Sequence, residues 1–266
     1  MTSFKLLLCN QMAGITHRDM IILLMVTIEP KGLLPAYNPI TTCRRDATVS
    51  QLAQILDQYQ FIHVRGTPSS GKTRLAKLLQ EHYHRGGERA FYKSTWKLLD
   101  ERTVWKTFAE HFGCPEEEVE GTVFLLDEAQ SSYEDEVFWN TVIKEAYEHE
   151  REFRICLFAS YGSPSTGLPH SPGKLTPAWI PFAQRVSIMP THEEDSPSFG
   201  AFYSRDEFDD ALTRLSTNLP GNFTFEDGAK DYIFHMTNGH PGGVKSITKY
   251  IHQVSCSPPL CFLICR

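Results

Sequence analysis

The sequence contains no cysteine pair of the C-x-x-C type, although it has seven cysteines in 266 residues. An odd number of cysteines without paired spacing argues against a disulfide framework and against a zinc site. Cys156 stands inside an apolar run, where a thiol behaves as a small buried hydrophobic group. The cysteine pattern therefore favours a reducing compartment.

An excess of positive charge is also missing, because 26 lysines and arginines are outnumbered by 32 aspartates and glutamates, for a net charge of −6. This balance argues against a uniformly basic surface that binds nucleic acid, but it is compatible with a local basic patch. The apolar stretch MIILLMVTI, Met20–Ile28, is too short to cross a bilayer. We therefore expect no membrane span.

Short apolar runs alternate with amphipathic segments over the middle of the chain. This alternation is typical of an α/β fold with a mainly parallel sheet and helices on both faces. An acidic linker and then purely helical patterns follow. We expect an N-terminal extension (1–46), an α/β core (47–190), a helical lobe (191–254) and a C-terminal tail (255–266).

Capping residues predict where three helices begin. Ser50 is placed to cap the helix before FIHVR, and Ser132 with Asp135 has capping-box spacing at the start of SSYEDEVFWNTVIKEAY. Ser204 with Glu207 has the same spacing at the start of the helical lobe.

A phosphate-binding signature, GTPSSGKT, follows the apolar run FIHV. It fits the pattern G-x-x-x-x-G-K-[ST] with Gly66, Thr67, Pro68, Ser69, Ser70, Gly71, Lys72 and Thr73. Glycine lets the backbone curl so that N–H groups face phosphate oxygens, and the following helix adds its N-terminal dipole. We expect Lys72 to reach the β- and γ-phosphates and Thr73 to offer its hydroxyl to Mg²⁺. An ordinary strand–turn–helix connection is the alternative.

Such a loop needs an acidic partner at the end of a neighbouring strand. The run VFLLDE places Asp127 and Glu128 directly after four apolar residues. We expect Asp127 to hold Mg²⁺ and Glu128 to orient and activate an attacking water. An acid pair that only starts a helix is the alternative for this motif alone, but the two motifs together favour nucleotide chemistry.

With both motifs present, the chain resembles P-loop ATPases of the AAA+ and STAND-like division. The resemblance implies a three-layer sandwich with a five-stranded sheet, in the order AFYKS, TVFLL, RICLFAS, FIHVR and RVSIM, followed by a small helical lobe. It also implies that Ser160, at the end of RICLFAS, takes the place of the polar sensor residue and acts beside Lys72 and Glu128. Many members have asparagine or threonine there, so the serine is a departure from the pattern.

The helical lobe contains TNGHPGGVKSI, which resembles a Gly-x-Pro element that closes over adenine, at an expected helix break over residues 238–243. The resemblance implies that Gly239, His240 and Pro241 line the base and that Lys245 is a sensor-2 residue. A plain helix–helix turn is the alternative. More narrowly, FIHVRGTPSSGKTRL, FLLDEAQ and FASYGSPS resemble the NTPase modules of fungal Crinkler and RHS-like proteins.

The expected function is Mg²⁺-dependent ATP binding and hydrolysis that drives a conformational switch or remodels a partner. The ligands are ATP, ADP and Mg²⁺, with a protein partner or self-association; a nucleic-acid partner has no supporting feature. A nucleotide-binding interaction module with little hydrolysis and a small-molecule P-loop kinase are the alternatives. We expect an intracellular, cytoplasmic protein, with an effector secreted into a host cell as the alternative.

Overall fold

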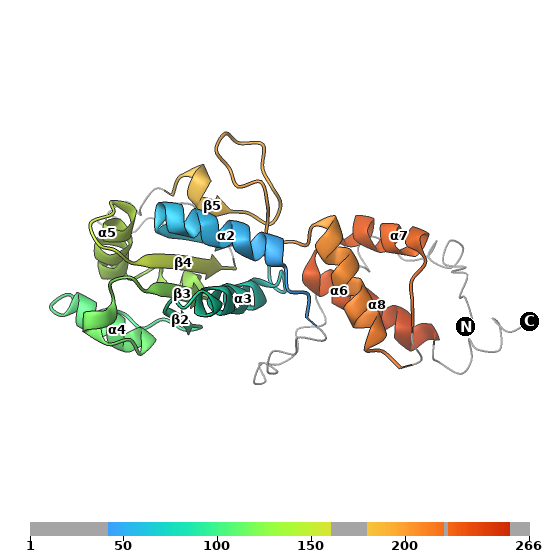
Figure 1. The fold of residues 1–266 in the computed structure, drawn as a ribbon, viewed down its shortest axis with the longest axis horizontal. Coiled ribbons are helices and arrows are strands. Elements are labelled where there is room, and N and C mark those ends of the chain that lie inside the picture. The colour runs from blue at the N-terminus through green and yellow to red at the C-terminus, as the bar shows by residue number, and fades with distance from the viewer. Residues whose placement is uncertain (1–41, 161–179, 221–222, 256–266) are drawn as a thin grey trace, which may run out of the picture. The chain divides into compact units, whose positions relative to one another are not determined.

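The computed structural model describes residues 42–160, 180–220 and 223–255 (Figure 1). The first 41 residues of the expected extension, the tail from residue 256 and residues 161–179 lie outside this range. Contacts divide the described residues into a larger unit, within residues 45–201, and a smaller unit, which includes residues 42–44, 202–220 and 223–255. No helix of the described residues is long and apolar enough to cross a membrane.

The larger unit is built on a five-stranded sheet with the order β2-β3-β4-β1-β5. The strands are β1 (Phe61–Arg65), β2 (Ala90–Lys93), β3 (Val123–Asp127), β4 (Arg154–Ala159) and β5 (Arg185–Val186). Every pairing between these strands is parallel. The order that the resemblance implied and the expected α/β class are therefore confirmed.

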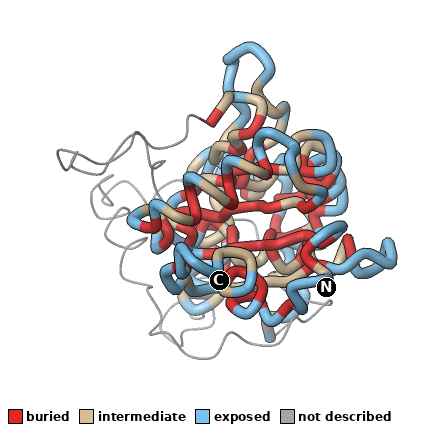
Figure 2. Tube along the Cα trace, turned by 90° about the vertical axis from the view of Figure 1, so that its left-hand side faces the viewer, coloured by how far each residue is buried: buried red, intermediate tan, exposed pale blue. Residues whose placement is uncertain are grey.

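Helices cover both faces of the sheet. On one face lie α2 (Asp46–Tyr59) and α3 (Lys72–Arg85), which contact each other and the strands. On the other, α4 (Val104–Phe112) and the π-helical segment η5 (Phe138–Ile143) pack aromatic side chains into one core with the sheet. Figure 2 shows buried strands in the middle and exposed residues on the outer sides of the helices. The expected three-layer sandwich is confirmed.

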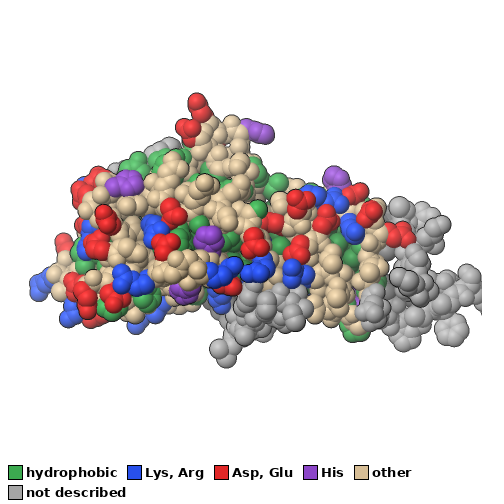
Figure 3. All heavy atoms as spheres, in the orientation of Figure 1, with side chains coloured by type: hydrophobic (Ala, Val, Ile, Leu, Met, Phe, Trp, Pro, Cys, Tyr) green, Lys and Arg blue, Asp and Glu red, His purple; other side chains and the backbone are tan. Residues whose placement is uncertain are grey.

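Short helical elements complete this unit: η3 (Glu116–Glu118), η4 (Ala129–Ser132), α5 (Lys144–Tyr147), which continues η5, and η6 (Phe182–Gln184). On the face shown in Figure 3, acidic and basic side chains are interspersed over the described residues. This mixture agrees with the absence of a strongly basic composition.

Two of the expected helix starts are wrong. α2 begins at Asp46, because Arg45 takes the left-handed backbone conformation (φ 54°) and turns the chain into the helix; Ser50 lies inside it. The second helix is capped by Asp135 alone, whose carboxylate accepts a backbone N–H at 3.0 Å. The Ser132 hydroxyl instead donates to a carbonyl in the preceding turn, so the capping box does not form.

The linker after β5 belongs to the larger unit up to Ala201. The Ala201 N–H donates to the Ser187 carbonyl at 2.8 Å, and the buried Arg45 guanidinium donates to the Ala201 carbonyl at 2.9 Å. These buried polar contacts tie the end of the linker to the segment after β5 and to the start of α2.

Three helices form the smaller unit: α6 (Arg205–Thr217), α7 (Asp227–Thr237) and α8 (Pro241–Ser255). They share a small apolar core of Phe208, Leu212, Phe225, Ala229, Ile233, Val244 and Ile251. The expected capping box at α6 is confirmed, since the Ser204 hydroxyl and the Glu207 carboxylate each accept the other residue's N–H. The helical C-terminal part is therefore present.

A tight turn joins α7 to α8. Gly239 has φ 74°, and a Cβ there would collide with the Tyr203 backbone, so the position requires glycine. His240 caps α8, because its Nδ1 accepts the Gly243 N–H at 2.9 Å, and Pro241 is the first helical residue, a position that proline favours. The break is therefore shorter than expected, and the Pro241–Gly243 stretch belongs to α8.

Candidate nucleotide-binding site

The loop of residues 66–73 connects β1 to α3, where the sequence predicts a phosphate-binding loop. Its first N–H, on Gly66, donates to the Ala159 carbonyl at the end of β4, at 3.1 Å. A Cβ on Gly66 would lie 2.4 Å from the Ser70 hydroxyl oxygen, so the close packing of the loop on itself favours glycine at this position. The loop is thus anchored to the centre of the sheet and tightly folded.

Two residues of this loop have left-handed backbone, Ser69 (φ 61°) and Gly71 (φ 88°). Such residues are typical of nests, in which neighbouring N–H groups point at one anion. α3 begins directly after Gly71, and this N-cap residue supplies no side-chain hydrogen bond to the first N–H groups of the helix. The N-terminal end of the helix dipole therefore also favours an anion here. The geometry of this loop and the strand order of the sheet together identify the fold. The chain has a P-loop NTPase fold.

Lys72, the loop lysine, is buried and turned back onto the loop. Its Nζ donates to the carbonyls of Gly66 at 3.1 Å and Thr67 at 2.9 Å, and lies 3.5 Å from the Ser70 hydroxyl. Burial lowers the pKa of Lys72, while the nearby carboxylates of Glu128 and Asp127 act in the opposite direction. A phosphate would have to replace these carbonyls as the partner of the ammonium group.

Asp127 ends β3 and is almost fully buried, at 2% exposure. Its Oδ1 accepts the Glu128 N–H at 3.0 Å, and its Oδ2 accepts the Tyr92 hydroxyl at 3.0 Å. Burial, followed by the charge of Asp127, raises the pKa of Tyr92, so this phenol stays protonated and remains a donor. The orientation of the Asp127 carboxylate is therefore fixed from β2.

Glu128 follows Asp127 in the left-handed conformation, with φ 51° and ψ 40°, and its side chain is exposed. Its Oε2 accepts a hydrogen bond from Gln130 Nε2, and Ser160 Oγ lies 3.4 Å from the same oxygen. The Ser160 N–H in turn donates to Gln130 Oε1 at 3.0 Å. Glu128, Gln130 and Ser160 thus form one hydrogen-bonded group.

Sequence reasoning missed Tyr92 and Gln130. Tyr92 lies in an expected strand, but only the strand order and register bring it to Asp127, which is 35 positions away. Gln130 stands two positions after Glu128, and its role depends on a contact with Ser160 that sequence spacing does not reveal.

The parallel sheet brings the predicted residues of the larger unit to one edge. Arg65, just before the loop, pairs with Ala159, just before Ser160, and Asp127 pairs with Phe158 on the other side of β4. Lys72, Asp127, Glu128 and Ser160 therefore meet at the carboxyl ends of three adjacent strands. Thr73 follows Lys72 in the first turn of α3, partly exposed.

The donors at this edge fit a magnesium ion better than a metal held by protein alone. Within the described ranges, no group of three histidine, cysteine or acidic side chains comes together. Mg²⁺ in nucleotide sites is usually held by one or two protein oxygens together with phosphates and water. The oxygens of Thr73 and Asp127 match that donor set.

The helical unit holds the remaining predicted residues. His240 and Pro241 begin α8, as described above, and Lys245 is an exposed residue of the same helix. The Nδ1 of His240 is already used as the cap of α8. The contact of these three residues with a nucleotide stays a prediction.

A buried histidine lies two residues before the loop strand ends. Because the Arg65 Nε can only donate, its 3.4 Å contact assigns His63 Nδ1 as the acceptor, so Nε2–H donates to the Tyr133 hydroxyl at 3.1 Å. Burial, with the charges of Arg65 and Arg185, lowers the pKa of His63 to about 3. This imidazole is therefore neutral at physiological pH.

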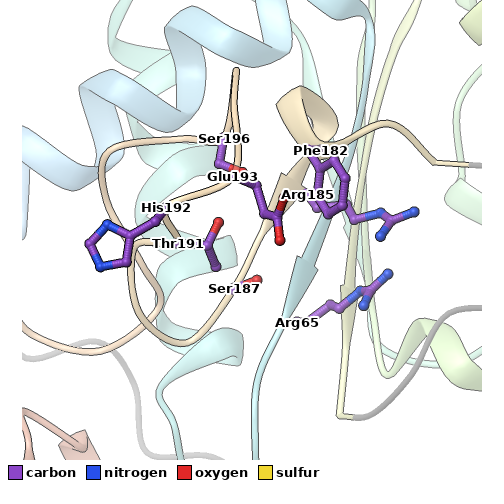
Figure 4. Close-up of a pocket in the computed structure, with 8 residues that line it drawn as sticks. All are labelled: Arg65, Phe182, Arg185, Ser187, Thr191, His192, Glu193 and Ser196. Atoms are coloured by element: carbon purple, nitrogen blue, oxygen red, sulfur yellow. The ribbon is translucent and has the colours of Figure 1, made fainter.

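A cavity of about 530 Å³ opens beside the ends of β1 and β5 (Figure 4). Its lining consists of Arg65, Phe182, Arg185, Ser187, Thr191, His192, Glu193 and Ser196. In Figure 4 the guanidinium groups of Arg65 and Arg185 extend in the same direction. The guanidinium carbon of Arg185 lies 5.0 Å from the centroid of the Phe182 ring. The two arginines add positive charge to this side of the sheet.

Comparisons with known proteins give similarities only among solved structures. No protein-family model and no curated protein sequence matches the chain. A RuvB variant from Thermotoga maritima aligns at 14% identity and a TM-score of 0.44, over 79% of this chain and 62% of that one. Drosophila ORC bound to DNA aligns at 13% identity and a TM-score of 0.44, over 89% of this chain and 60% of that one.

A Walker-type ATPase of Pyrococcus abyssi aligns at 13% identity and a TM-score of 0.44, over 87% of this chain and 78% of that one. The chain thus spans about three-fifths of the RuvB and ORC chains. The assignment of the P-loop NTPase fold rests on the strand order and the loop geometry. Closeness to Crinkler and RHS-like modules stays a prediction.

Proposed function

We propose that this chain binds ATP together with Mg²⁺ and hydrolyses it. The observation that carries the proposal is the meeting of Lys72, in a phosphate-binding loop, with the carboxylates of Asp127 and Glu128 at the same edge of the sheet. A loop that only joined a strand to a helix would have no need of a buried lysine close to two acids.

Binding uses the loop and the start of α3. The N–H groups of residues 66–73 would donate to phosphate oxygens, and Lys72 would exchange the carbonyls of Gly66 and Thr67 for the β- and γ-phosphates. Thr73 and Asp127 are the residues that would hold Mg²⁺, which supplies positive charge to the phosphates. Tyr92 keeps the Asp127 carboxylate in one orientation for this purpose.

Hydrolysis would use Glu128 as the general base. As the water oxygen attacks the γ-phosphorus, the bond to the β–γ bridging oxygen breaks and the water proton passes to Glu128. Within the described part of the chain, Glu128 Oε1 accepts no hydrogen bond, whereas Oε2 is engaged by Gln130. Oε1 is therefore the atom placed to take the proton, and Ser160 is the polar group that would meet the γ-phosphate.

The proposal extends to a switch. Because Lys72 must leave its loop carbonyls when phosphate binds, the loop has different hydrogen bonds in its empty and nucleotide-bound states. Such a difference is what a second copy or a partner protein could recognise. A helical lid over residues 191–254, with Gly239, His240 and Pro241 at the adenine and Lys245 as a sensor-2 residue, belongs to the same proposal.

Glu128→Gln tests the proposal, because the amide keeps the shape of the side chain but cannot accept the proton. ATP should bind about as in the wild type, and phosphate release should fall by about 100-fold or more. Phosphate release and fluorescent-nucleotide binding are measured side by side. Wild-type turnover in the variant would exclude Glu128 as the base, and tight ATP binding without any wild-type turnover would leave a nucleotide-binding module.

A further inference from the structure

Gln130 occupies a position between the proposed base and the end of β4. Its Nε2 donates to Glu128 Oε2, and its Oε1 accepts the Ser160 N–H at 3.0 Å. Both ends of one amide are thus used, one toward an acid and one toward a strand end. The contact with the Ser160 N–H is partly buried, whereas the contact with Glu128 is exposed to solvent.

Glu128 needs such support because little else restrains its carboxylate. The residue is exposed and its backbone is left-handed, a conformation that non-glycine residues adopt at a cost. Among the residues that the structure describes, the only other hydrogen bond of this carboxylate to a side chain is the 3.4 Å approach of Ser160 Oγ. Without Gln130 the carboxylate would be free to populate several rotamers, each lost again on reaching the reactive geometry.

The Gln130 contact also leaves the reactive atom available. Because Gln130 and Ser160 both meet Oε2, the carboxylate is held by one oxygen while Oε1 stays open to a water molecule. A glutamine donor is neutral, so it fixes the carboxylate without adding a competing charge. This arrangement is the one that a positioned general base requires.

We infer that Gln130 is a positioning residue that sets the place of the Glu128 carboxylate and couples it to the end of β4. The inference rests on the proposed function, since it concerns the same base. It adds that movement of Ser160 is passed to Glu128 through one side-chain amide. Contact of the strand end with a γ-phosphate would then adjust the base at the moment of binding.

The test is Gln130→Met, which keeps the length of the side chain and removes both hydrogen bonds. We expect kcat for ATP hydrolysis to fall about 10-fold while KM for ATP stays within about twofold, because only the placement of the base is lost. In the Glu128→Gln background, the same change should have no further effect. Gln80→Met is the matched control, since it removes a glutamine hydrogen bond to the Ala90 carbonyl far from Glu128.

Hydrogen exchange gives a second readout, which reports on the contact between Gln130 and the end of β4. The Ser160 amide should exchange about 10-fold faster in Gln130→Met, the scale for loss of one hydrogen bond, with neighbouring β4 amides unchanged. Normal kcat in Gln130→Met, together with loss of turnover in Glu128→Gln, would overturn the inference alone. A further fall in the double variant would also overturn it, because Gln130 would then act independently of Glu128. A wild-type protein without turnover would overturn the proposed function and this inference together.

Discussion

Lys72 shows how one side chain can report whether the loop is a nucleotide site. Its ammonium group is held by two loop carbonyls and sits in the field of two carboxylates. Under the proposed function, a phosphate would replace these contacts with stronger, charge-assisted hydrogen bonds. A lysine with a purely structural role would keep its hydrogen bonds to the loop carbonyls when nucleotide is added.

Lys72→Ala should therefore weaken ATP binding by about 100-fold or more, because a charge-assisted contact contributes roughly 3 kcal/mol. Titration with a fluorescent ATP analogue measures the effect. Lys106→Ala, on the exposed side of α4, is the control and should bind as the wild type does. Affinity within a few-fold of the wild type in Lys72→Ala would show that the loop does not bind nucleotide.

The residues that local patterns predict are those whose chemistry follows from their own neighbours in sequence. The loop glycines, Lys72 and Thr73 form one short motif, and Asp127 with Glu128 forms another. Tyr92 and Gln130 were not predicted, because their roles depend on contacts across the sheet edge. Ser160 was placed by resemblance, and the structure brings it to Glu128.

At the level of elements, hydrophobic periodicity located strands and helices better than it located helix ends. Three central strands, β1, β3 and β4, lie in the apolar runs that predicted them and are buried along almost their whole length. The edge strand β2 is only half-buried, and β5 is shorter than the expected RVSIM strand, since it contains only Arg185 and Val186. Helix starts depend on single backbone angles, such as that of Arg45, which no periodicity encodes. The π-helical segment η5 has the same apolar pattern as an α-helix, so hydrophobic periodicity did not predict it.

His63 connects two of these elements, since it lies on β1 and contacts Tyr133 in the segment after η4. Its folded pKa of about 3 lies below the ordinary value of 6.5, so the unfolded chain binds the proton more readily. Stability from the neutral imidazole is therefore full above about pH 6.5 and is lost as the pH falls toward 3. The free energy of unfolding therefore increases with pH over this range, as expected for a buried base that is neutral in the folded protein.

His63→Gln should remove this dependence on pH. Between pH 7 and pH 5 the free energy of unfolding should fall by about 2 kcal/mol more in the wild type than in the variant. Urea unfolding at both pH values measures the difference. His84→Gln, at an exposed histidine of α3, is the control and should keep the wild-type pH dependence. Equal losses in the wild type and His63→Gln would contradict the assignment of a neutral, buried His63.

At the scale of the whole molecule, the open question is whether the helical unit takes part in nucleotide binding. Three of its four predicted residues are poor probes. Gly239 leaves no room for a side chain. His240 caps α8 and Pro241 is its first residue, so changing either would disturb the helix itself. Lys245 is exposed, and a change there should leave the three-helix core intact.

Lys245→Ala should therefore isolate the role of the lid. If Lys245 contacts the nucleotide as the sensor-2 residue that the resemblance implies, the variant should bind MgATP about 10-fold more weakly, a loss of roughly 1.4 kcal/mol. At a fixed ATP concentration well above Kd, the stabilisation that ATP gives to the folded chain should fall by the same amount, since it follows RT ln(1 + [ATP]/Kd). Thermal unfolding with and without MgATP measures this change in stabilisation.

Lys249→Ala, one turn further along α8, is the control and should behave as the wild type. The melting temperature of Lys245→Ala without ATP should equal that of the wild type, which would show that the variant is folded. An ATP-dependent shift equal to that of the wild type would then mean that Lys245 does not contact the nucleotide. That result would make the Gly239–Pro241 element a plain connection between two helices and leave ATP binding to the larger unit.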